Sequence, residues 1–313
     1  MSNFYVNIAR VGNNILVREY DAVQDKIIQY KDEFNPTLYL PSNKESEMKT
    51  LDGRYLDKIQ PGNMKDCRDF LDTYKHLDDF EVYGNTDYII QYISKKYTNM
   101  DYDLTKIKVA NIDIEVGSDE GFPKPDEAAY PVTGITVYDN VEDKYHIFGY
   151  DKFGTGHWQL RYTEHEFITA DNSEYYNCKN ETDLLKTFLK YWQKQAFAAM
   201  TGWNIEGFDV PYLVNRITSQ IGERASKRLS PWGFVREKKI RGDFGQDIFS
   251  YDIMGITVLD YLQLYKKYTY KAQESYTLDH IAYVELGEKK LSYEEEGSLH
   301  QLYKTNYPKY MDY

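Results

Sequence analysis

Residues 111–116 read Asn-Ile-Asp-Ile-Glu-Val, and residues 201–212 read Thr-Gly-Trp-Asn-Ile-Glu-Gly-Phe-Asp-Val-Pro-Tyr. In the first stretch two carboxylates stand at i and i+2 in a β-branched run. On a strand both therefore point to one face, about 7 Å apart along it. A divalent cation held between two such repelling acids explains the pair best. In the second stretch an apolar run ends at Asn204, and a helical pattern begins at Phe208-Asp209. The side chain of Asp209 is then a third carboxylate for the same cation.

The same residues have plainer interpretations. Asp113 and Glu115 could form an exposed polar face of a strand, although the flanking Val109 and Ile112 favour burial of both faces. Asp209 could simply lie in the first turn of a helix, where a negative charge is favourable. From the residues alone, both interpretations stay open.

A wider set of motifs resembles a known family. Asp113-x-Glu115, followed by Thr201-Gly202-Trp203-Asn204-x-x-x-Phe208-Asp209, resembles the first two proofreading-exonuclease motifs of family B replicative DNA polymerases, and most closely those of T-even-type bacteriophages. The resemblance continues through Gly222-Glu223-Arg224 and Lys227-Arg228-x-Ser230-Pro231. It covers the chain from Asn3-Phe4-Tyr5 to the last residue.

The resemblance implies a reaction and a cofactor. The reaction is hydrolysis of the terminal phosphodiester at a DNA 3′ end, which releases a nucleoside monophosphate. Asp113, Glu115 and Asp209 would be the catalytic metal ligands of two Mg²⁺ (or Mn²⁺) ions about 4 Å apart. Oxygen ligands suit Mg²⁺, and the sequence offers no competing cluster of His or Cys.

The resemblance also implies contacts to single-stranded DNA or a primer 3′ end. Asn204 and Phe208 would hold the frayed strand, and Phe122, in the loop after the first motif, would stack on a base. A packed loop Phe is the plainer alternative for Phe122. Arg241 lies in a hairpin expected over residues 239–251, which in the family helps to separate the primer from the template. We therefore expect Arg241 to contact DNA.

The third motif of the family is Tyr-x-x-x-Asp. Residues 306–313 resemble the approach to it, so the catalytic tyrosine of this motif is Tyr313. The fourth acid would fall four residues further on. Asp312 is a poor substitute because on a helix it points about 100° away from Tyr313. We therefore expect a site one carboxylate short, in a fragment or in one half of a split polymerase whose C-terminal portion, in the same or a separate chain, completes it.

A polymerase palm is not expected in this chain. Residues 83–88 read Tyr-Gly-Asn-Thr-Asp-Tyr, which resembles a palm motif but has Asn85 in place of its first acid and precedes the exonuclease motifs. A different class of function is a non-catalytic module that binds single-stranded DNA or docks other replication proteins. The presence of three carboxylates together favours a working nuclease site over such a module.

The pattern of apolar residues predicts an α+β and α/β chain of two domains. Residues 1–105 should form a small N-terminal α+β domain, and residues 106–313 an exonuclease domain with a mixed sheet. A ribonuclease H-like topology for that sheet is implied by the resemblance. The expected strands and helices of the second domain are strands 107–116, 132–138, 145–150, 197–203 and 256–260, and helices 182–194, 209–221, 261–268, 277–286 and 297–313, the last interrupted at Pro308.

Charge and composition limit the partners. A formal net charge of −12 argues against a protein that coats duplex DNA, because phosphate neutralisation needs a broad field of Lys and Arg. Seven positive charges between Arg224 and Arg241 are the richest local source, although a solvated loop would look the same. No apolar run is long enough to span a membrane, and no signal-peptide pattern is present. We expect a soluble protein of the cytoplasm, which the resemblance implies is that of an infected bacterial host.

Overall fold

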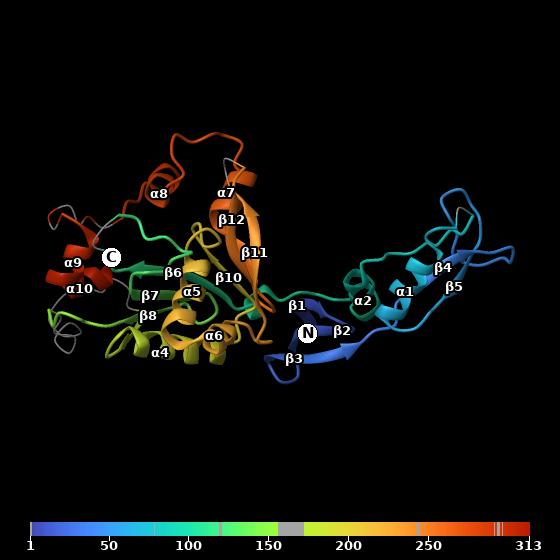
Figure 1. Cartoon of the computed structure of the whole chain (residues 1–313), viewed down its shortest axis with the longest axis horizontal. Coiled ribbons are helices and arrows are strands. Elements are labelled where there is room, and N and C mark those ends of the chain that lie inside the picture. Colours follow the sequence, from blue (N-terminus) through green and yellow to red (C-terminus); the bar gives the residue numbers. More distant parts are fainter. Residues whose placement is uncertain are drawn as a thin grey trace. The chain divides into compact units, whose positions relative to one another are not determined.

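The structure is a computed structural model that describes residues 2–77, 79–118, 121–155, 172–242, 245–290, 292, 295 and 297–313. The chain forms two compact units, Met1–Leu104 and Thr105–Tyr313, each with its own buried core (Figure 1). Among the described residues, no helix has both the length and the apolar character needed to cross a membrane.

The first unit is rich in β-structure. Its elements are β1 (Phe4–Val11), β2 (Asn14–Asp21) and β3 (Lys26–Glu33) in one antiparallel sheet, β4 (Leu38–Pro41) paired with β5 (Leu56–Ile59), and the helices α1 (Met64–Tyr74) and α2 (Tyr88–Lys96). Gly12 has a positive φ, which lets β1 turn tightly into β2. Asn63 caps α1 and Asp87 caps α2 through side chains that accept backbone amides.

The second unit is built on a six-stranded mixed sheet, which confirms the expected mixed α/β fold class. Its strand order is β13-β10-β6-β7-β8-β9. The strands are β6 (Val109–Val116), β7 (Val132–Asp139), β8 (Lys144–Gly149), β9 (Ser173–Asn177), β10 (Ala199–Gly202) and β13 (Thr257–Asp260). The strand β7 runs antiparallel to both β6 and β8, whereas β10 runs parallel to both β6 and β13, and β9 runs parallel to β8.

Helices and a hairpin complete this unit. They are α4 (Glu181–Gln195), α5 (Asp209–Ile221), α6 (Glu223–Ser226), the 3₁₀ turns Leu104–Lys106 and Lys227–Leu229, the hairpin β11 (Val235–Arg241) and β12 (Asp247–Ile253), α7 (Tyr261–Tyr268), α8 (Leu278–Leu286), α9 (Leu299–Thr305) and α10 (Tyr307–Asp312). The hairpin is longer than expected. The break expected at Pro308 falls at Asn306 instead, because proline is tolerated in the first turn of a helix.

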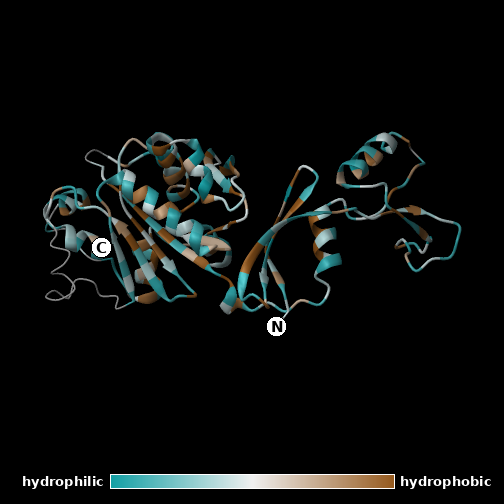
Figure 2. Cartoon of the chain, turned by 90° about the horizontal axis from the view of Figure 1, so that it is seen from below, coloured by the Kyte–Doolittle hydropathy of each residue, from teal (hydrophilic) through white to brown (hydrophobic). Residues whose placement is uncertain are grey.

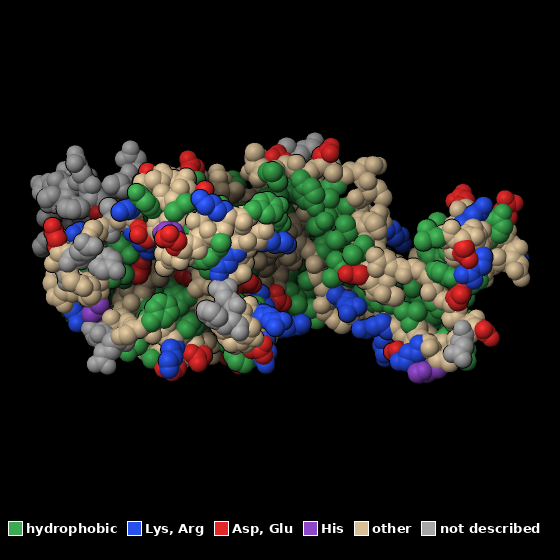
Figure 3. All heavy atoms as spheres, turned by 90° about the horizontal axis from the view of Figure 1, so that it is seen from above, with side chains coloured by type: hydrophobic (Ala, Val, Ile, Leu, Met, Phe, Trp, Pro, Cys, Tyr) green, Lys and Arg blue, Asp and Glu red, His purple; other side chains and the backbone are tan. Residues whose placement is uncertain are grey.

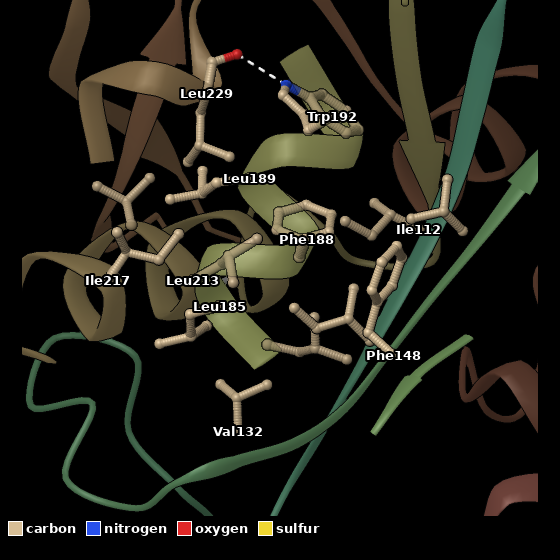
Figure 4. Packing of buried hydrophobic residues seen from close by; sticks show 14 of the residues in the cluster. Ile112, Val132, Phe148, Leu185, Phe188, Leu189, Trp192, Leu213, Ile217 and Leu229 are labelled. Atoms are coloured by element: carbon tan, nitrogen blue, oxygen red, sulfur yellow. Dashed lines mark hydrogen bonds between the residues drawn. The ribbon is translucent and has the colours of Figure 1, made fainter. Parts of the chain in front are cut away.

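The core of the second unit lies between the sheet and the helices α4 and α5 (Figure 2). The apolar stripe of α4 is fully buried there, with Phe188 and Trp192 packed against Leu213 of α5 and Ile112 of β6 (Figure 4). The Trp192 indole donates a hydrogen bond of 2.8 Å to the Leu229 carbonyl. A buried polar atom is thereby satisfied without opening the core.

A buried ion pair joins α5 to α4. The Arg216 guanidinium donates to both oxygens of Glu181, at 2.7 and 2.8 Å, and to the carbonyls of Ala128 and Ala129 at 3.0 Å. Glu181 in turn accepts the Val132 amide at the start of β7. Because both charged groups are almost completely buried, loss of one partner leaves the other charge uncompensated.

We expect Arg216→Met to lower the free energy of unfolding of the second unit by about 3–5 kcal/mol, the usual cost of breaking a buried pair. Urea unfolding followed by tryptophan fluorescence measures this loss of stability, because all four tryptophans of the chain belong to this unit. Lys227→Met is the matched control, since Lys227 pairs with Glu223 at the exposed surface and should cost about 1 kcal/mol or less. Equal losses in the two variants would contradict this assignment.

Candidate active site

The strand β6 brings two of the predicted acids to one face. Its side chains alternate, with Ile112 and Ile114 buried in the core and Asp113 and Glu115 on the opposite face. Asp113 is exposed to solvent and Glu115 is largely covered.

The helix α10 covers the sheet next to Glu115. The residue opposite Glu115 on β7 is Gly134, and a Cβ there would lie 3.4 Å from Met311 and 3.6 Å from Glu115. At Gly149 of β8, a Cβ would lie 2.3 Å from the Tyr307 hydroxyl, so only glycine lets α10 approach this closely. This packing fixes the end of α10, where Tyr313 follows.

Asp209 reaches the same strand from α5. It is the first residue of that helix, it is 4% exposed, and its carboxylate accepts the Ile114 amide at 3.1 Å. Ile114 lies between the two acids of β6, so this hydrogen bond brings the third carboxylate to them. The positive end of the helix dipole also favours a negative charge at this position.

Burial raises the pKa of all three carboxyl groups, and the charge of Asp113 adds to the shift of Glu115 and Asp209. Burial and the nearby Asp113 charge raise the pKa of Glu115 to about 8, whereas the Lys290 ammonium opposes this shift. Burial, followed by the charge of Asp113, raises the pKa of Asp209 well above its usual range, despite the stabilising amide of Ile114. Asp113 keeps contact with solvent, but the surrounding protein partly desolvates its carboxyl group, which raises its pKa against the effect of Lys290. Each acid would therefore gain from a nearby positive charge.

Lys290 supplies one such charge, and the sequence analysis missed it. Burial works to lower the pKa of its ammonium, but the nearby Tyr313, Glu115 and Asp113 outweigh burial and raise it. The ammonium lies 3.4 Å from the Tyr313 hydroxyl, to which it donates, and 4.9 Å from the centre of that ring. The Lys290 backbone amide donates to Asp279 of α8 at 2.9 Å, which fixes the loop that carries it.

The donor set suits a divalent cation by its chemistry. Asp113, Glu115 and Asp209 offer hard oxygen ligands whose repulsion a cation would relieve. Across the residues that the structure describes, however, no three or more His, Cys, Asp or Glu side chains are grouped so that they could hold a metal ion. One oxygen of Asp209 is already bonded to the Ile114 amide.

The loop after β10 places Asn204. A Cβ at Gly202 would lie 2.5 Å from the Ile112 carbonyl, so glycine allows the close approach of this loop to β6. Asn204 has a positive φ, and its backbone amide donates to the buried carboxylate of Asp260 at 3.2 Å. Asp260 also accepts the amides of Glu206 and Leu262. The sequence analysis missed Asp260. An acid directly before a helical pattern, with Gln263 three residues later, is a helix-capping signal that could have identified this residue.

The two predicted aromatic contacts lie together. The rings of Phe122 and Phe208 have centres 5.2 Å apart, at an angle of 52°. Phe122 is 80% exposed, so the interpretation of a packed loop Phe describes it only in part.

The predicted basic segment is largely engaged with other side chains. Lys238 pairs with Glu206, Lys239 pairs with Asp247, and Arg228 donates to Gln193. Arg241 is exposed at the end of β11, on the hairpin rather than on the elements that carry the acids. The structure thus places Asp113, Glu115 and Tyr313 near Lys290, and it places Asp209 at the backbone amide of Ile114.

The mixed sheet with its covering helices is consistent with an exonuclease domain, and comparison of the sequence with known families shows this class. The profile of the DNA polymerase family B exonuclease domain matches residues 55–281, and the chain belongs to this family. Two curated relatives are the DNA-directed DNA polymerases of Enterobacteria phage T4, 35% identical, and of Escherichia phage RB69, 33% identical. Each match covers 100% of this chain and 36% of the relative. The chain therefore spans about a third of the length of these relatives.

We expect the metal-free chain to lose stability between about pH 5.5 and pH 8.5. The pKa of Glu115 is about 8 in the folded chain, compared with about 4.3 when unfolded. The stability that protonated Glu115 contributes to the folded chain is therefore fully present below its unfolded pKa, and it is lost as the pH rises through 8. Glu115→Gln should flatten the decline, measured by urea unfolding in EDTA.

Glu223→Gln is the control for this measurement. Glu223 is an exposed acid whose pKa is lowered by its hydrogen bond to Lys227, so it titrates below this window. An unchanged slope in the Glu115 variant would show that this carboxyl group is already ionised at pH 5.5.

Proposed function

We propose that this chain hydrolyses the 3′-terminal phosphodiester of single-stranded or frayed DNA, as the proofreading 3′–5′ exonuclease portion of a phage DNA-directed DNA polymerase. The observation that carries this proposal is the hydrogen bond from the Ile114 amide to the carboxylate of Asp209, which holds this acid beside the strand that carries Asp113 and Glu115. Membership of the family B exonuclease domain supplies the reaction class.

Asp113, Glu115 and Asp209 would hold Mg²⁺ or Mn²⁺, with two ions expected in the complete site. When bound, such ions activate a water molecule and stabilise the departing 3′ oxygen. The raised pKa of Glu115 means that the carboxyl group would release a proton as the cation binds.

The other residues would bind and orient the strand. The exposed ring of Phe122 offers a stacking surface beside Phe208, and Asn204 lies at the turn that leads to this pair. The Lys290 ammonium would hold the Tyr313 hydroxyl toward the scissile phosphate and stabilise negative charge that develops there. Arg241, on the hairpin, would contact the DNA backbone away from the acids.

The partners follow from the relatives. Both are DNA-directed DNA polymerases, and the chain spans only part of their length. We therefore include a polymerase portion, in the same or a separate chain, among the partners of this one, and place the reaction in the cytoplasm of an infected bacterial host.

The test is degradation of a 5′-labelled single-stranded oligonucleotide with Mg²⁺ or Mn²⁺, by the chain alone and with a polymerase portion added. We expect a ladder that shortens from the 3′ end and that Asp113→Ala abolishes. Binding of the oligonucleotide without any shortening, with or without that portion, would favour the alternative of a non-catalytic single-stranded-DNA-binding or docking module.

We expect Lys290→Ala to slow 3′-end hydrolysis by about 10- to 100-fold, because it removes a positive charge near the acids. Lys289→Ala is a matched control, since the Lys289 ammonium lies over the Tyr283 ring, 4.8 Å from its centre. The rate at saturating DNA and metal should fall only in the first variant. Equal rates in the two variants would remove Lys290 from the mechanism.

A further inference from the structure

The helix α7 carries aromatic rings along one side, and the two at its ends are exposed, whereas Tyr265 between them is half-buried and donates to Glu285. Tyr261, Tyr265 and Tyr268 occupy positions i, i+4 and i+7, which form one stripe of a helix. Such a stripe usually faces a core, but here the buried residue of the helix is Leu262. Tyr261 is 56% exposed and Tyr268 is 67% exposed, and Tyr270, just past the helix, is fully exposed.

Lysines lie between these tyrosines. From Tyr261 to Lys271 the chain carries Lys266, Lys267 and Lys271 and no acidic residue, in a protein whose formal net charge is −12. The Lys267 ammonium lies 5.5 Å from the centre of the Tyr268 ring. We call Tyr261, Tyr265, Tyr268, Tyr270, Lys266, Lys267 and Lys271 the tyrosine–lysine strip. Viewed from the side of α7, hydrophobic and basic side chains lie next to one another on the surface (Figure 3).

The strip is attached to the loop of the candidate active site. The Trp203 ring, next to Asn204, lies 6.1 Å from the ring of Tyr261 and 5.9 Å from that of Tyr265. The Trp203 indole donates to the Tyr276 carbonyl at 3.0 Å, and Asp260 joins the Asn204 amide to the first turn of α7. An aromatic path therefore leads from the Asn204 loop onto the helix.

We propose that the tyrosine–lysine strip binds single-stranded DNA upstream of the 3′ end. Flat aromatic faces that alternate with positive charges match unpaired bases on a phosphate backbone, and stacking on tyrosine tolerates any sequence. Only the direction of the strand, with its 3′ end toward Asn204, rests on the proposed function. The helix is about 12 Å long, so the strip adds contacts for several nucleotides beyond the terminal one.

The test compares fluorescent oligothymidines of about twelve and about three nucleotides, bound to the whole chain in EDTA and followed by anisotropy. We expect the longer strand to bind more tightly, and the double variant Tyr268→Ala/Tyr270→Ala to weaken its binding by about tenfold or more. The affinity for the short strand should not change. Tyr145→Ala is the matched control, because Tyr145 is an exposed tyrosine on β8, near the other edge of the sheet.

A second measurement does not depend on affinity. A strand that carries 5-iododeoxyuridine upstream of its 3′ end should photocross-link to Tyr268 or Tyr270, identified by mass spectrometry. Unchanged affinity of the double variant, or cross-links confined to other residues, would overturn the proposal and leave the strip as a surface for a protein partner. Binding and cross-linking at the strip without 3′-end hydrolysis would instead contradict only the proposed function.

Discussion

The amide of Ile114 needs a hydrogen-bond acceptor, and this requirement organises the site. The strand β10 pairs with β6 only as far as Asn111, because the chain leaves the sheet after Gly202. Beyond that point the described part of the chain places no strand beside β6 on this side, and a buried amide without a partner is costly. The carboxylate of Asp209 takes the place of the missing strand. The third acid is therefore held where β10 ends, between the two acids of β6.

This arrangement concentrates negative charge that the described fold only partly balances. Lys290 provides a positive charge, but both it and Asp113 keep contact with solvent, which screens their attraction. Glu115 and Asp209 lie in more enclosed positions and bear most of the cost, which raises their pKa. The close acids thus destabilise the folded chain, as expected of residues positioned to bind a cation and a phosphate rather than to stabilise the fold.

Local patterns predicted the parts of the site that depend on neighbouring residues. The period of two along β6 placed Asp113 and Glu115 on one face, and the apolar stripes of α4 and α5 predicted the helices that cover the sheet. Lys290 could not be found in this way, because it reaches the acids across 175 residues of sequence and from a loop without periodicity. The break between α9 and α10 was predicted at Pro308, but it lies at Asn306. The sequence pattern shows where the proline is, but it does not show that this proline falls in the first turn of a helix, where proline is tolerated.

The loop that carries Asn204 is fixed from two sides, and this links the acids to the surface beyond them. Gly202 is pressed against the Ile112 carbonyl, so the loop cannot move toward β6. On the other side, Asp260 accepts the amides of Asn204 and Leu262 with one oxygen and that of Glu206 with the other. The same carboxylate therefore sets the geometry of the Asn204 turn and the start of α7. A strand held at Asn204 would meet α7 in a fixed orientation, because one buried side chain defines both.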